Sequence, residues 1–155
     1  MKRTSSSVIS LRRSRGFSLI EVLITILIFA IGLLGMAALQ AVSMRSNQSA
    51  NFRTQATALA YMMIDRMRAN GEAVLRGDYL AGMTAGDCSA DPADSPIATH
   101  DIQTWRQQLA CQLPGGQGAI TFPGDGVHVQ ITWTDARWSL IPSERSTTFE
   151  LVTKL

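Results

Sequence analysis

A long apolar run near the amino terminus constrains this chain more than any other feature. Residues 17–39 are 23 consecutive positions with a single charged side chain, Glu21. As an α-helix the run extends over roughly 34 Å, enough to cross a hydrocarbon core about 30 Å thick. The run therefore predicts a membrane-spanning helix. The chain has 155 residues, which leaves room for one further small domain.

The charges differ sharply before and after this run. No acid precedes Glu21, whereas five basic side chains do: Lys2, Arg3, Arg12, Arg13 and Arg15. The net charge is +2, but without the first 16 residues 9 basic and 12 acidic side chains remain. The basic excess therefore belongs to the leader and gives no support for nucleic-acid binding. Basic clusters beside an apolar span stay in the cytoplasm, so we expect a single pass through the inner membrane with the following domain in the periplasm.

Three ordinary export signals are alternatives. They are a retained signal anchor, a secretory signal cut near Ala41-Val42-Ser43, and a twin-arginine signal at Arg12-Arg13. The run is longer than the 7–15 apolar residues typical of a cleaved signal. It is also more hydrophobic than a usual twin-arginine signal. A plain anchor gains nothing from Glu21, because a carboxylate inside an apolar helix costs about 2.5–3.5 kcal/mol.

Cleavage between Gly16 and Phe17 would give Glu21 a positive partner. The new amino group would lie four residues before Glu21, about 6 Å along a helix axis. In a staggered array of helices, Glu21 of one subunit can pair with the terminal amine of its neighbour. Such a buried pair fixes register more than it adds stability.

These residues resemble a known processing signal. Residues 15–22 read RGFSLIEV, which is similar to the class III signal of type IV pilins and pseudopilins. The resemblance implies that prepilin peptidase cleaves after Gly16 and methylates the amino group of Phe17. It also implies that Glu21 is needed for assembly.

Three further segments resemble the PilV subgroup of minor pilins. They are residues 31–40, residues 65–70 (DRMRAN) and residues 101–118. This resemblance implies a minor pilin that helps to initiate assembly of the type IV pilus and is in some cases incorporated in the extracellular fibre. The implied partners are prepilin peptidase, other minor pilins, the major pilin and the pilus assembly platform. The alternatives are a type II secretion pseudopilin and a signal-anchored periplasmic binding module.

The chain beyond the apolar run predicts an α+β fold. Residues 52–67 carry apolar side chains at steps of 3 and 4, so the helix should continue as an amphipathic segment to about Asn70. We therefore expect a leader at residues 1–16, a transmembrane helix at 17–39, its amphipathic continuation at 40–70 and a globular head at 71–155.

Within the head we expect a helix and a small antiparallel sheet laid on the amphipathic helix. Thr99 or Asp101 should cap the short helix, whose apolar face is Ile102, Trp105, Leu109 and Leu113. Strands are predicted at residues 119–122, 127–134 and 147–152. The segment 71–95 reads as loop with a short helical piece.

Cys88 and Cys111 are the two cysteines of the chain, and both lie in the predicted head. In an oxidising compartment they can form a disulfide, whereas in the cytosol they would be unpaired thiols. Export favours the disulfide.

No catalytic, cofactor or metal site is predicted. His100 and His128 are isolated, and the chain has no nucleophile-elbow, zinc-protease or phosphate-loop motif. Four acids, Asp87, Asp91, Asp94 and Asp101, lack the spacing of an EF-hand calcium loop. We therefore expect a structural protein.

Overall fold

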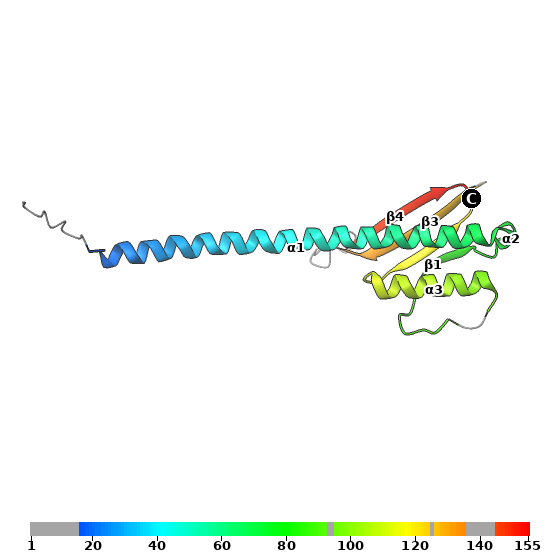
Figure 1. The fold of residues 1–155 in the computed structure, drawn as a ribbon, viewed down its shortest axis with the longest axis horizontal. Coiled ribbons are helices and arrows are strands. Elements are labelled where there is room, and N and C mark those ends of the chain that lie inside the picture. The colour runs from blue at the N-terminus through cyan, green and yellow to red at the C-terminus, as the bar shows by residue number, and fades with distance from the viewer. Residues whose placement is uncertain (1–15, 93–94, 125, 136–144) are drawn as a thin grey trace, which may run out of the picture. The chain divides into compact units, whose positions relative to one another are not determined.

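A computed structural model describes residues 16–92, 95–124, 126–135 and 145–155. The fold is α+β, as predicted: a long amino-terminal helix and a small antiparallel sheet (Figure 1). The leader residues 1–15 and Asp94 lie outside the described residues. In chain order the elements are α1 (Leu19–Ala69), α2 (Gly71–Leu75), β1 (Ala81–Ala85), α3 (Ile97–Gln112), β2 (Gln117–Thr121), β3 (Val127–Thr134) and β4 (Ser146–Thr153).

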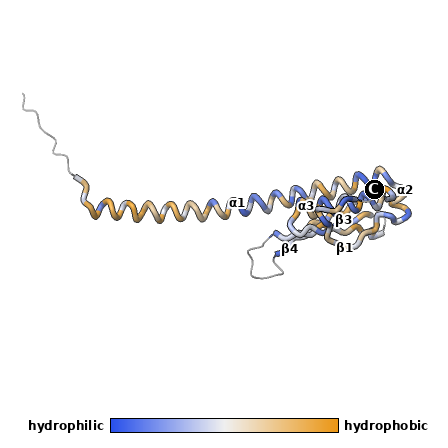
Figure 2. The backbone as a smooth tube through the Cα atoms, turned by 90° about the horizontal axis from the view of Figure 1, so that it is seen from below, coloured by the Kyte–Doolittle hydropathy of each residue, from blue (hydrophilic) through white to orange (hydrophobic). Residues whose placement is uncertain are grey.

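The chain divides into two compact units, Met1–Ser43 and Met44–Leu155, so the boundary falls within α1. In the first unit every described residue is exposed, and the helix surface is predominantly apolar (Figure 2). By length and composition α1 is able to cross a membrane. All of the buried residues among those described belong to the second unit, which therefore has its own hydrophobic core.

The second half of α1 is amphipathic because its apolar residues recur on one face. The buried residues on this face are Ala56, Leu59, Ala60, Met63, Ile64 and Met67, and Phe52 is half-buried. This confirms the predicted stripe and adds Ile64 to it. Alanine at 56 and 60 leaves little side chain between the helix backbone and the core.

The sheet is a meander in which neighbouring strands are antiparallel, in the order β1-β2-β3-β4. In β3 the side chains of Val127, Val129, Ile131 and Trp133 are buried and alternate with half-buried polar residues. The predicted bounds of β3 are confirmed. The sequence reading missed β1, because only Ala81 of its five residues is buried and no alternation marks it as a strand.

Helix α3 lies beside the head half of α1. Trp105 is fully buried, and its indole N–H donates to the backbone carbonyl of Leu59 at 3.1 Å. The ring also lies against Gly118 of β2, where a Cβ atom would come within 2.4 Å of it, so this position requires glycine. The predicted apolar face of α3 is confirmed.

The predicted cap of α3 is wrong. The helix begins at Ile97 with Pro96 at the N-cap position and no side-chain cap hydrogen bond. Asp101 instead lies one turn inside the helix, where its carboxylate accepts a hydrogen bond from Tyr79. A tertiary hydrogen bond thus replaces the local cap that the sequence suggested.

Candidate functional site

The candidate processing site lies immediately before α1. Gly16, Phe17 and Ser18 precede the first helical residue, Leu19. The carbonyl of Ser18 accepts hydrogen bonds from the amides of Glu21 and Val22, which marks the start of the helix. A peptide bond between Gly16 and Phe17 is therefore outside the helical hydrogen-bond ladder.

Gly16 is not required by the packing of the described chain. A Cβ atom built there meets no atom within 4 Å, and its backbone does not adopt a positive φ. Neither of the two usual internal reasons for glycine applies. A demand for glycine at this position would therefore come from a molecule that binds the segment.

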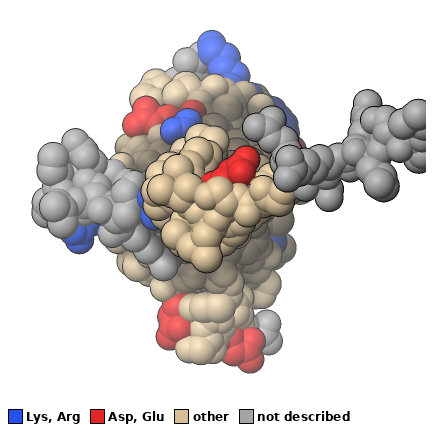
Figure 3. All heavy atoms as spheres, turned by 90° about the vertical axis from the view of Figure 1, so that its left-hand side faces the viewer, with Lys and Arg blue, Asp and Glu red and all other residues tan. Residues whose placement is uncertain are grey.

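Glu21 lies in the first turn of α1 on an exposed surface. A shallow groove of about 280 Å³ is lined by Phe17, Glu21, Val22, Thr25 and Ile26. The hydroxyl of Thr25 donates to the backbone carbonyl of Glu21 at 2.6 Å. This hydrogen bond does not involve the carboxylate of Glu21. In the described part of the chain no cation pairs with this carboxylate. The helix end that faces the viewer in Figure 3 is almost wholly uncharged. In the sequence, Glu21 is the one charged residue of the apolar run 17–39.

A polar cluster holds the end of α1 to the head. The Tyr79 hydroxyl donates to the Asp101 carboxylate at 2.6 Å, and Asn70 donates to the Tyr79 oxygen at 3.4 Å. Arg66 lies 3.6 Å from the Asp101 carboxylate and donates to its backbone carbonyl at 3.2 Å. Burial raises the pKa of Tyr79 to about 12, and its bond to Asp101 acts in the same direction.

This cluster gives the segment 65–70 a structural role. Arg66 and Asn70 contact the cluster, whereas Asp65 and Arg68 form an exposed pair at 3.1 Å, as their spacing predicts. The sequence pattern does not predict the contribution of Tyr79, because residues 71–95 have the composition of a loop with a short helical piece. The sequence signal for this contact is Tyr79 itself, an aromatic residue with a hydroxyl group among turn residues.

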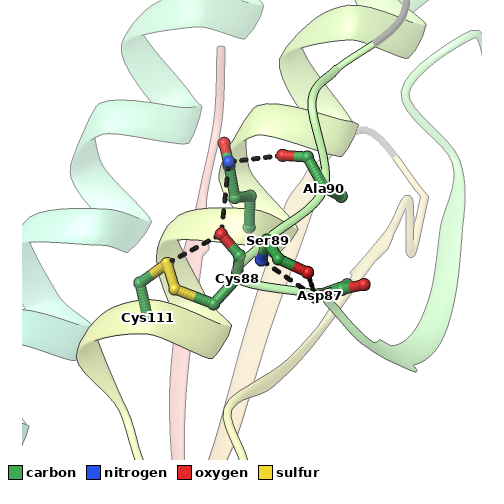
Figure 4. The surroundings of a disulfide bond; sticks show 6 residues. Asp87, Cys88, Ser89, Ala90 and Cys111 are labelled. Carbon is green, nitrogen blue, oxygen red and sulfur yellow. Dashed lines mark hydrogen bonds between the residues drawn. A yellow bond between two sulfur atoms is a disulfide. The ribbon is translucent and has the colours of Figure 1, made fainter.

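A disulfide between Cys88 and Cys111 also stabilises the head (Figure 4). It fixes the loop after β1 to the end of α3. The side-chain amide of Gln107 donates to the backbone carbonyl of Ala90 at 2.5 Å and so holds the same loop. Both the amide and the hydroxyl of Ser89 donate to Asp87, and these bonds hold the pKa of Asp87 below its ordinary value.

Within the described residues, no group of three or more His, Cys, Asp and Glu side chains could hold a metal ion. His128 faces Glu150 across β3 and β4, with 3.6 Å between Nε2 and the carboxylate. The arrangement is a cross-strand pair on the outer face of the sheet, in which His128 is half-buried and Glu150 is exposed.

Residues 11–37 match the family model of the prokaryotic N-terminal methylation motif. The match supports a type IV pilin or pseudopilin. It implies processing by prepilin peptidase and assembly at the membrane. The matched segment includes Gly16, Phe17 and Glu21 but none of the head. No curated protein and no solved structure matches the chain.

Proposed function

We propose that this protein is a minor pilin of the PilV type that helps to initiate assembly of the type IV pilus. The observation that carries the proposal is the amino-terminal arrangement: a non-helical Gly16–Phe17 bond, followed by a single carboxylate in the first turn of an exposed apolar helix. The motif match at residues 11–37 supports the same reading.

The first step is processing. Prepilin peptidase cuts after Gly16 and methylates the new amino group of Phe17. Removal of the leader takes away the basic residues that precede the helix and leaves a cation four residues before Glu21. The leader therefore keeps the subunit from assembling until the peptidase has acted.

The second step is pairing between subunits. The Glu21 carboxylate has no cationic partner in the described chain, and an unpaired charge among apolar helices is costly. The methylated amine of a neighbouring Phe17 removes that cost when the two helices are staggered. Wrong staggers leave the charge unpaired, so the pair selects one axial register.

The third part of the proposal is the location of the protein in the cell. The exposed apolar surface of α1 fits the inner membrane before assembly and a helix-packed filament afterwards. A disulfide in the head fits the periplasm. There the head would meet other minor pilins, the major pilin and the assembly platform.

A type II secretion pseudopilin is the second candidate, because the methylation motif is common to both classes. The segment 65–70 favours the pilus, since its resemblance to the PilV subgroup lies outside the shared motif. Deleting the protein separates the two functions. Loss of surface pili with normal export of folded proteins supports the minor pilin, and the reverse result supports the pseudopilin.

The central test replaces Glu21 with glutamine, which keeps the shape of the side chain and removes its charge. We expect Glu21→Gln to be cleaved, methylated and inserted normally, yet to fail to support piliation. Mass spectrometry of the membrane-extracted protein reports processing, and electron microscopy counts pili.

The matched control is Asp65→Asn, which also replaces a carboxylate with an amide on α1. Asp65 is exposed and already pairs with Arg68. This variant should leave piliation intact. Normal piliation with Glu21→Gln would refute the register mechanism. A mature protein that keeps Met1 would refute the processing step as well.

A further inference from the structure

The two edges of the sheet differ in how well they are protected from a further strand. β1 has five residues, and its pairing with β2 is irregular between Ala81 and Thr84. β4 has eight residues and pairs with β3 without interruption from Ser146 to Thr153. It contains no proline and no bulge, which are two of the usual devices that protect an edge, and Glu150 is its single charged residue. The β4 edge is therefore open to pairing.

The outward-facing backbone groups of β4 can be assigned from one hydrogen bond. The amide of Asp135 donates to the carbonyl of Arg145 at 2.9 Å, and this pair continues the β3–β4 register. In an antiparallel ladder, hydrogen-bonded and non-hydrogen-bonded pairs alternate. The N–H and C=O groups directed away from β3 therefore belong to Ser146, Thr148, Glu150 and Val152.

The same residues carry the exposed side chains of β4. Val152 is 65% exposed, and the side chain of Glu150 is 54% exposed. Gln130 donates to one oxygen of Glu150 at 2.9 Å, and the carboxylate can still accept further bonds. The residues whose backbone groups point away from β3 are therefore the same residues whose side chains are exposed.

The sequence of this edge is complementary to itself in the antiparallel direction. Residues 149–155 read FELVTKL, where residues 149–153 belong to β4 and Lys154 and Leu155 directly follow it. When two copies are centred on Val152, Val152 faces Val152, Glu150 faces Lys154, and Phe149 faces Leu155. Lys154 already has an interaction within its own chain, which the new pair would supplement or replace. Opposite charges and paired apolar residues on facing strands are favourable.

The backbone is compatible with the same register. Glu150 and Val152 direct their backbone groups outward, so the pairs centred on Val152 are those that exchange hydrogen bonds. A register centred on Glu150 would instead place two carboxylates opposite one another, which is unfavourable. We propose that a second copy of this chain binds along β4, antiparallel and centred on Val152, to form one continuous eight-stranded sheet.

The symmetry of this pairing fixes how the two heads are oriented. Its two-fold axis is perpendicular to the sheet, and the head half of α1 packs against one face of that sheet. The rotation therefore reverses the direction of this part of α1 between the two heads. The inference concerns the head alone and goes beyond the proposed role in assembly.

The test uses the oxidised head, residues 44–155, which contains the whole described core. Sedimentation equilibrium over a range of concentrations measures the dimer dissociation constant. Glu150→Lys places two lysines opposite each other and should raise that constant about tenfold or more. Lys154→Glu should do the same. The double variant, Glu150→Lys with Lys154→Glu, restores opposite charges and should return the constant to near the wild-type value.

Asp65→Lys is the matched control, because it makes the same charge change on an exposed helix position away from β4. It should leave the dimer unchanged, and circular dichroism checks that every variant is folded. A head that stays monomeric at millimolar concentration overturns the proposal. So does a dimer that the single charge reversals do not weaken, or that the double reversal does not restore. Preferential pairing of this edge with another pilin in a mixture also overturns the assignment to a second copy.

Discussion

The two halves of α1 share one helix but differ in what covers their apolar side chains. In the half that belongs to the first unit, Leu27, Ile28 and Phe29 are 62–66% exposed. In the head half, Met63 and Met67 are fully buried against the sheet and α3. The head half is completed by its own chain. The first half is complete only with lipid or with helices of other subunits around it, because water does not support so large an apolar surface.

The two halves also differ in whether their charged side chains are paired. In the head half, Arg66 has Asp101 and Arg68 has Asp65. In the first half, Glu21 has no described cationic partner. Within the described residues, neither the apolar surface nor the single charge of this half is matched by another part of the chain.

The largest effect on head stability should come from a matched pair of substitutions in α1. Met63→Ala removes a fully buried side chain and should lower the free energy of unfolding by about 2–5 kcal/mol. Leu27→Ala removes an exposed one and should change it by no more than about 0.5 kcal/mol. Urea unfolding in detergent, followed by tryptophan fluorescence, reports the head because all three tryptophans follow residue 100.

If Leu27→Ala destabilised the head as much as Met63→Ala, the two halves would form one folding unit, and the comparison would fail. Membrane extraction provides the complementary measurement. Met63→Ala should leave the protein in the membrane fraction, since it does not alter the apolar span.

A somewhat smaller effect is expected from the disulfide, which links the loop after β1 to the end of α3. Replacing Cys88 and Cys111 by serine opens a loop that the bond closes across a separation of 23 residues. The chain-entropy model gives a loss of about 3 kcal/mol. Urea unfolding of the double variant, beside wild type with and without reductant, measures it. Reductant should destabilise the wild type and have no effect on the variant, and equal responses would contradict the prediction.

The smallest effect concerns pH and the cluster at the end of α1. The pKa of Tyr79 is raised from 10.0 to about 12 in the folded head. Folding therefore favours the protonated hydroxyl of Tyr79. Its contribution to the free energy of unfolding is full below about pH 10 and is lost as the pH rises toward 12. By pH 11 the loss should be about 1 kcal/mol.

Unfolding free energies at pH 9 and pH 11 test this sign. Tyr79→Phe removes the ionising group and should be less sensitive to the change than wild type. Tyr61→Phe, at an exposed position of α1, should keep the wild-type sensitivity. If Tyr79→Phe also kept it, another group would be responsible.

Much of the head followed from periodicity. The buried face of α1, the apolar face of α3 and the whole of β3 were predicted because each repeats at 3.6 or 2 residues. The failures were β1 and the start of α3. β1 is a strand because β2 supplies its hydrogen bonds, and its Gly, Thr and Ala residues give no local sign of this. Asp101 does not cap because α3 already begins at Ile97, and its carboxylate accepts a hydrogen bond from Tyr79, 22 residues away in the chain.

The sequence by itself determined that the chain has an apolar helix with one acid, a basic leader before it and a small α+β head after it. These features depend on composition and on spacing along the chain, which sequence shows directly. Only the tertiary structure decided that residues 66 and 70 contact Tyr79 and Asp101, and that β4 is an open edge. Each of these depends on groups brought together from distant positions, whose hydrogen bonds are set by packing rather than by the neighbouring residues.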